Sequence, residues 1–106
     1  MPRNQYLLKI HPSFRGGSEV IAICDKKHIG KRYESASAVV LDLEKHRRFY
    51  DGDEAGGEAV VAALENCANV NAVGEKSVAL ACEALKIPKS CAKRIGGVPH
   101  LQIYRI

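Results

Sequence analysis

Apolar and polar residues alternate with a period of two near the start of the chain, which is the pattern of β-strands. The segment 5–11 alternates in this way, and Pro12 ends it. Residues 14–18 are rich in turn formers, so we expect 19–24 to return as a hairpin partner. Because this returning segment is apolar on both faces, it is typical of a central strand that is covered on both sides.

Shorter elements follow in the next part of the chain. Residues 25–30 form a polar connection, and 31–34 and 38–43 each predict a short strand. The segment 47–50 is expected to continue as a short extended piece. Residues 51–53, Asp-Gly-Asp, then form a turn.

The apolar period changes from two to 3.6 in the second half, which predicts two helices. The first has apolar residues at helical spacing over 60–68. Asp53 is its expected N-cap, with a start nearer Gly57 as the alternative, because adjacent glycines weaken a first turn. Asn71 is expected to cap the second helix and Pro88 to end it.

Residues 91–95 and 101–106 predict two final strands, joined by the turn 96–100, Gly-Gly-Val-Pro-His. The order of strands, two helices and strands predicts an α+β fold. Its sheet is expected to be mixed or mostly antiparallel, with the two helices packed on one face. Residues 1–106 are expected to form a single domain.

The composition is that of an ordinary soluble protein, with 46% hydrophobic and 26% charged residues. No stretch reaches the roughly 18 apolar residues of a membrane-spanning helix, and the start has no apolar core of a secretory signal. We therefore expect a cytoplasmic protein that does not contact a membrane.

The net charge of +4 is distributed unevenly. Residues 1–33 carry seven Lys/Arg against two acids, and residues 84–106 carry five against none. The middle, 34–83, carries four against ten. If the two basic ends meet in space, they form a face that attracts phosphate backbones more strongly than the net charge indicates.

Two internal segments concentrate cations. The segment 25–32 surrounds Gly30 but lacks the spacing of a phosphate-binding P-loop, and 45–50 mixes cations with two aromatic residues, a pattern found in single-stranded nucleic acid sites. A solvated loop and buried aromatic anchors would explain the same residues. With the C-terminal segment they give the candidate RNA contacts Lys26, Lys27, Lys31, Arg32, Arg47, Arg48, Lys93, Arg94, His100 and Gln102.

Free N–H groups at the start of the second helix, and glycines in the last turn, can hold an anion at close range. The candidate anion-binding positions are Asn71, Gly74, Gly96 and Gly97. Helix capping and packing would explain these residues equally well, and Glu75 would compete for the same donors.

The cysteines and serines form no catalytic or metal-binding motif. Cys24, Cys67, Cys82 and Cys91 contain no C-x-x-C pair, so no metal is expected. A pair of Cys91 with His100 would lack the third, orienting group that nucleophilic catalysis needs. We therefore expect no catalytic residue and no cofactor, with His100 as a hydrogen-bonding or packing residue.

Several short motifs occur in order along the chain. They are Cys24-Asp25, Gly30-Lys31 and Phe49-Tyr50 with Gly52; Ala68-Asn69, Val73-Gly74-Glu75 and Val78; and Arg94-Ile95-Gly96-Gly97-Val98-Pro99-His100 with Gln102. Together they resemble an archaeal family, the domain of unknown function 424. The resemblance runs over nearly the whole chain and implies a small cytosolic α+β protein. For families of this kind, RNA binding or a role in translation is suspected.

We therefore predict a non-catalytic, translation-related RNA-binding or ribosome-associated protein. Its expected partner is RNA, ribosomal RNA above all, with ribosomal proteins or translation factors as further partners. One alternative is a small-molecule or enzymatic site at the 96–100 turn, in a pocket lined by His100, Asn71 and Glu75. A second is an adaptor whose acidic helix face binds a basic protein.

Overall fold

The structure is a computed structural model that describes residues 5–12, 19–65 and 69–104. Its centre is a six-stranded sheet with the order β5-β1-β2-β6-β8-β7. Strands β2 and β6 are parallel and the other neighbours are antiparallel, so the predicted mixed sheet and α+β class are confirmed. The strands are β1 (Tyr6–His11), β2 (Val20–Asp25), β5 (Asp53–Ala55), β6 (Asn69–Val73), β7 (Lys93–Ile95) and β8 (Val98–Tyr104).

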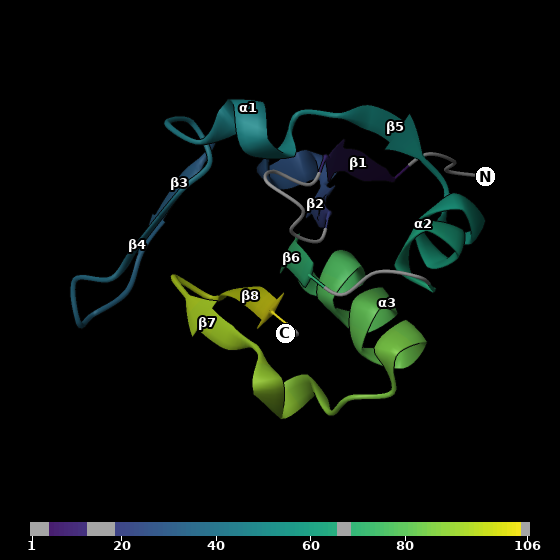
Figure 1. Ribbon diagram of the computed structural model, residues 1–106. Helices are drawn as coiled ribbons and strands as arrows, with labels where there is room; N and C mark the ends of the chain where they lie inside the picture. Colours follow the sequence, from purple (N-terminus) through teal and green to yellow (C-terminus); the bar gives the residue numbers. More distant parts are fainter. Residues whose placement is uncertain (1–4, 13–18, 66–68, 105–106) are drawn as a thin grey trace.

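Helices α2 (Gly57–Leu64) and α3 (Glu75–Leu85) pack together over one face of this sheet, as predicted (Figure 1). Alternation along the strands turns Ile23, Val70 and Leu101 toward the helices, where all three side chains are fully buried. We call this the helix face of the sheet.

The opposite face is covered by smaller elements. These are the hairpin β3 (Arg32–Glu34) with β4 (Val40–Asp42), the one-turn helix α1 (Arg47–Tyr50) and the 3₁₀ turn at Lys26–His28. Figure 1 shows the hairpin extending away from the main sheet beyond α1. Cys24 and Val73 from the sheet pack here with Leu43 and Tyr50 in a second core. We call this the hairpin face.

The expected extended piece at 47–50 is wrong, because this segment forms α1. The Asp42 carboxylate accepts backbone N–H groups of Glu44 and Lys45 and so starts the helical turns. Two β1 side chains also reach this helix: Lys9 donates to the carbonyl of Arg48, and His11 Nε2 lies 2.9 Å from the carbonyl of Phe49. A single turn is too short to show a helical period.

The expected N-cap at Asp53 is also wrong, because Asp53 begins β5 on the outer edge of β1. The alternative start is confirmed: α2 begins at Gly57, with Gly56 as its N-cap. The close approach of this segment to β1 requires Gly52, where a Cβ would lie 2.1 Å from the Leu8 carbonyl oxygen. The predicted helical positions 67 and 68 lie outside the described residues.

The expectation that 69–71 separates two helices, with Asn71 as a cap, is wrong as well. Residues Asn69–Val73 form β6, and α3 starts behind Gly74. The strand is polar only on the side of Asn69 and Asn71, while Val70 and Ala72 are buried against the helices. Near the end, the final turn is shorter than predicted: only Gly96 and Gly97 connect β7 to β8, and Cys91 belongs to a 3₁₀ turn rather than to a strand.

Candidate functional site

A cavity of about 330 Å³ lies on the hairpin face of the sheet. Strands β6 and β8 form its floor, and β4, α1 and the turn before α1 form its walls. Its rim includes Val40 and Tyr104, whose side chains are 41% and 60% exposed. The polar and aromatic lining residues are Asp42, His46, Phe49, Tyr50, Asn71, His100, Gln102 and Tyr104.

The pairing of β6 with β8 brings the floor residues together. Asn71 is opposite Gln102 and Val73 is opposite His100 in this antiparallel register. Opposed residues of an antiparallel pair share one face, and every second residue of a strand returns to it. Asn71, His100 and Gln102, separated in the sequence, therefore meet beneath α1.

Asn71 is a buried amide on this floor, with only 3% of its surface exposed. Its Nδ2 donates to the hydroxyl of Tyr104 at 3.0 Å. Its Oδ1 has no hydrogen-bond partner among the described residues. Because an unpaired buried acceptor costs about 1–3 kcal/mol, a donor that reaches this oxygen, from water or from a ligand, would stabilise the protein.

His100 and Tyr50 form an uncharged pair beside this amide. The Tyr50 hydroxyl lies 3.5 Å from His100 Nε2. Burial lowers the pKa of His100 and, with the nearby Cys24 and Tyr104, raises the pKa of Tyr50. Both groups are therefore neutral near pH 7, and a neutral imidazole offers one donor and one acceptor.

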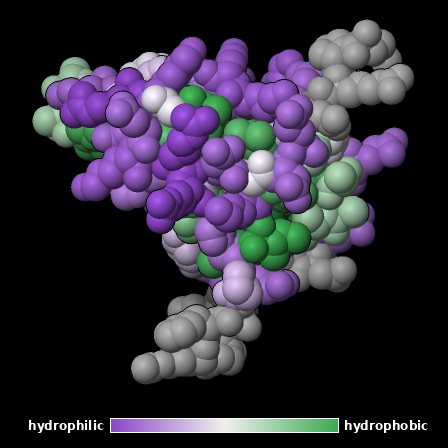
Figure 2. Space-filling model, turned by 90° about the horizontal axis from the view of Figure 1, so that it is seen from above, coloured by the Kyte–Doolittle hydropathy of each residue, from purple (hydrophilic) through white to green (hydrophobic). Residues whose placement is uncertain are grey.

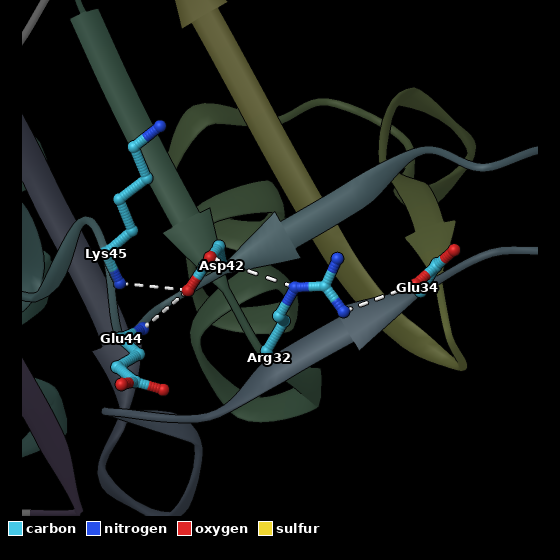
Figure 3. Close-up of polar contacts among 5 residues, drawn as sticks. All are labelled: Arg32, Glu34, Asp42, Glu44 and Lys45. Atoms are coloured by element: carbon cyan, nitrogen blue, oxygen red, sulfur yellow. Dashed lines mark hydrogen bonds and ion pairs between the residues drawn. The ribbon is translucent and has the colours of Figure 1, made fainter.

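Asp42 adds a negative charge to the cavity wall (Figure 3). Its Oδ1 accepts the backbone N–H groups of Lys45 at 2.9 Å and Glu44 at 3.1 Å, and its Oδ2 lies 3.8 Å from Arg32 Nε. These contacts, the Lys45 hydrogen bond foremost, lower the pKa of the carboxyl group. Asp42 is therefore ionised at neutral pH, which makes the wall unfavourable for an anion.

The two basic segments of the sequence lie next to each other beside this cavity. Leu43 N–H donates to the Lys31 carbonyl, and Gly30 N–H donates to the Leu43 carbonyl. A Cβ at Gly30 would lie 3.4 Å from Arg47 Nη1. From above, on the side of α1 and β5, the surface is mostly hydrophilic (Figure 2).

Exposed carboxylates neutralise half of the eight predicted Lys and Arg contacts. Lys26 pairs with Glu54 at 2.5 Å, Arg32 with Glu34 at 3.2 Å, Arg47 with Asp51 at 3.2 Å and Arg94 with Glu75 at 2.6 Å. Within residues 5–12, 19–65 and 69–104, no ion pair forms at the other four, which are exposed. These are Lys27, Lys31, Arg48 and Lys93.

The adjacent residues Lys93 and Arg94 lie on opposite faces of β7. Lys93 is opposite His100, on the side of the cavity. Arg94 is opposite Pro99, on the side of the helices, where it bonds Glu75 and the Gly97 carbonyl. Strand alternation thus leaves only Lys93 beside the candidate site.

The four anion-binding candidates do not come together. Asn71 lies in the cavity, and Gly96 and Gly97 form the β7–β8 turn. At the start of α3, the N–H groups of Lys76 and Ser77 donate to the carboxylate of Asp25 instead. The protein's own buried side chain occupies the place where we expected an external anion.

The pocket proposed around His100 exists, with a different lining from the one expected. His100 and Asn71 line it, whereas Glu75 lies on the helix face in a smaller hollow with Arg94 and Pro99. The sequence did not single out Asp42 or Tyr104 as site residues. The alternation His100, Gln102, Tyr104 along one strand was the available signal for a polar sheet face.

Metal binding and cysteine nucleophiles were considered for the described part of the chain. No group of three or more His, Cys, Asp and Glu side chains there is placed to hold a metal ion. Burial, reinforced by Asp25, raises the pKa of the Cys24 thiol to about 12, so it stays protonated.

Among the described residues, no helix has both the length and the apolar character to cross a membrane.

Comparison with known proteins places the chain among relatives whose activity is not stated. None of the curated proteins compared with it matches. The structure is similar to the crystal structure of an uncharacterized conserved protein from Methanopyrus kandleri, with a TM-score of 0.69 and 26% sequence identity. The match covers 95% of this chain and 94% of the Methanopyrus chain. The family described as "Protein of unknown function (DUF424)" matches residues 13–106. The chain belongs to this family, as its motifs indicated.

Proposed function

We propose that this protein is a non-catalytic RNA-binding protein that contacts the phosphate backbone through its basic loops. The observation that carries the proposal is the meeting of residues 26–32 with residues 45–48 around Gly30 and Arg47. Two cation-rich segments that are separate in the sequence thereby form one surface. A ribosomal partner, a role in translation and a cytoplasmic location are parts of the same proposal.

The charges of this surface support phosphate binding. Lys27, Lys31 and Arg48 are exposed and have no ion pair with the described residues, so they can meet a phosphate without first losing a carboxylate. Arg47 is held by the exposed carboxylate of Asp51, and Arg32 by the exposed Glu34 and, at 3.8 Å, by the half-buried Asp42. Since exposed ion pairs contribute about 0–1 kcal/mol, a phosphate can replace these partners at small cost.

The cavity makes single-stranded RNA the favoured form. Its rim carries the aromatic rings of His46 and Tyr104 beside the basic surface. Single-stranded sites combine cations along the backbone with rings on which bases stack. A regular duplex would keep its bases stacked and paired, out of reach of this cavity.

The proposal is tested by measuring the affinity for a fluorescent single-stranded RNA over a range of salt concentrations. We expect the logarithm of the affinity to fall linearly with the logarithm of salt, by about 0.7 for each phosphate neutralised. Lys31→Glu should weaken binding and reduce this slope. Lys86→Glu is the matched control, because it makes the same charge change at the exposed end of α3.

Absence of binding, or binding indifferent to salt, would overturn the proposal. Equal losses in Lys31→Glu and Lys86→Glu would also contradict it, because net charge alone would then account for the affinity. Retention of ribosomal RNA by the purified protein, abolished by nuclease, would support the ribosomal partner over the adaptor alternative.

A further inference from the structure

We propose that the cavity on the hairpin face holds one unstacked nucleobase that carries an exocyclic amino group, as adenine and cytosine do. This inference rests on the RNA binding proposed above and adds the chemistry that would be recognised. It is carried by the cavity's size, by the neutral groups on its floor and by its unpaired hydrogen-bond acceptor.

The dimensions and lining of the cavity suit a planar heterocycle. Its volume of about 330 Å³ lies at the lower end of the roughly 300–1,000 Å³ typical of ligand sites. Aromatic rings from α1 and β8, together with Leu41 and Leu43, supply apolar contact. Such a lining favours a flat ring over a flexible chain or a compact ion.

The charges of the lining exclude a phosphate from the interior. No Lys or Arg lines the described cavity, and burial keeps His100 neutral by lowering its pKa. The ionised Asp42 would repel an anion at the wall. Phosphates are therefore expected outside the cavity and the base inside it.

The acceptors in the cavity select the amino group. Asn71 Oδ1 is buried without a partner in the described residues, and the Asp42 carboxylate can only accept. Asp42 already accepts two backbone N–H groups and faces Arg32, so the open acceptor of the two is Asn71 Oδ1, and a ligand that pairs with it must bring an N–H or O–H donor. The exocyclic amino group of adenine, cytosine or guanine supplies two N–H donors, whereas uracil has no amino group.

Two cations lie near the cavity where a sugar-phosphate chain would leave it. Arg32 Nε lies 3.8 Å from the Asp42 carboxylate on the wall. Lys93 lies opposite His100 on the other side. A base in the cavity therefore places its flanking phosphates near cations from β3 and β7.

The test uses the nucleoside monophosphates AMP, CMP and UMP, titrated separately and followed by the NMR signals of the Asn71 and Gln102 side-chain amides. We expect AMP and CMP to shift these signals at lower concentration than UMP. Inorganic phosphate should leave them unchanged. Asn71→Leu should weaken AMP and CMP binding about tenfold, as expected for a buried hydrogen bond.

Asn69→Leu is the matched control, because Asn69 lies on the same face of β6 but does not line the cavity. Thermal unfolding checks that each variant is folded. If Asn71→Leu does not fold, Tyr104→Leu removes the hydroxyl that Asn71 contacts from a largely exposed residue, and it should also weaken AMP binding.

The outcomes separate this inference from the proposed function. Equal binding of UMP and AMP, or displacement of AMP from the amides by inorganic phosphate, would overturn the base site. Salt-dependent RNA binding with no response of the two amides would also overturn it and leave the proposed function standing. AMP and CMP binding without RNA binding would support the cavity's ligand class and reject the RNA proposal.

Discussion

Asp25 at the end of β2 accepts two hydrogen bonds from Ser77 in α3, the backbone N–H at 2.8 Å and the hydroxyl at 2.6 Å. A third comes from the N–H of Lys76 at 3.1 Å. Both Asp25 and Ser77 are buried, at 3% and 0% exposure. The carboxylate thus satisfies donors that the first turn of a helix leaves free, at its positive end.

Asp25→Ala should reduce the free energy of unfolding by about 2–4 kcal/mol, because a helix cap and charge-assisted buried hydrogen bonds are lost together. Chemical denaturation monitored by circular dichroism measures this loss. Asp51→Ala removes an aspartate that forms an exposed ion pair with Arg47, and it should have little effect. A similar loss in both variants would contradict the capping role.

Gly74→Ala should be more destabilising than Gly97→Ala. Both glycines have positive φ, 106° and 82°. A Cβ at Gly74 would lie 2.4 Å from the Asp25 carboxyl group, whereas a Cβ at Gly97 would meet no atom within 4 Å. Gly97→Ala should therefore cost only the backbone strain of about 1–2 kcal/mol.

Denaturation midpoints of the two glycine variants measure the difference. If Gly74→Ala does not fold at all while Gly97→Ala does, the expectation is met in its strongest form. Equal midpoints would contradict the expectation, because the Asp25 side chain would then move away from the added Cβ without loss of stability.

Stability should fall as the pH falls below about 6.5, the ordinary pKa of histidine. Burial lowers the pKa of His100 and of His28 in the folded protein, so the unfolded chain binds protons first. Each such group can contribute at most about 1.4 kcal/mol per pH unit. The stability that each neutral histidine contributes is fully present above the pKa of the unfolded chain. It is lost as the pH falls from that value toward the lower pKa of the folded protein.

Unfolding measured between pH 5 and pH 8 tests this slope. His100→Gln should flatten it in part, and the combination with His28→Gln should flatten it further. A slope that is unchanged in both variants would show that other groups govern the pH dependence.

Lys93→Gln should weaken RNA binding more than Arg94→Gln. The two neighbours have the same charge, but only Lys93 lies on the face of the cavity, and Arg94 is bonded to Glu75. Lys93→Gln should also reduce the salt slope by about 0.7, the value for one phosphate on a single strand. Affinity measurements at two salt concentrations are sufficient, and a larger effect of Arg94→Gln would place the RNA on the helix face instead.

The elements with strong periodic patterns were predictable from the sequence. The alternation in 5–11, the apolar run in 20–24 and the helical spacing that ends near Pro88 each led to the observed element. In these segments local preference and burial favour the same structure.

The predictions from sequence were wrong where polar residues of the candidate site lie within a strand. Asn69 and Asn71 look like loop and cap residues, yet they lie on a central strand whose polar side faces the cavity. The cavity itself depends on the register that sets Asn71 against Gln102, a pairing between distant parts of the chain. No local pattern contains that information.

The parallel pairing of β2 with β6 determines when the candidate site can assemble during folding. The β3–β4 hairpin, α1, β5 and α2 all lie in the connection between these two strands. The other neighbour of β6 is β8, which is the last described strand of the chain. Contacts between residues that are distant in the sequence form slowly, because the entropy cost of closing the intervening loop comes before the contact energy is gained. The walls of the cavity come from the long connection between β2 and β6, and its floor needs β8 as well, so the cavity is complete only when both pairings have formed. A chain that has not yet paired β6 with β8 would have its basic loops but no place for a base.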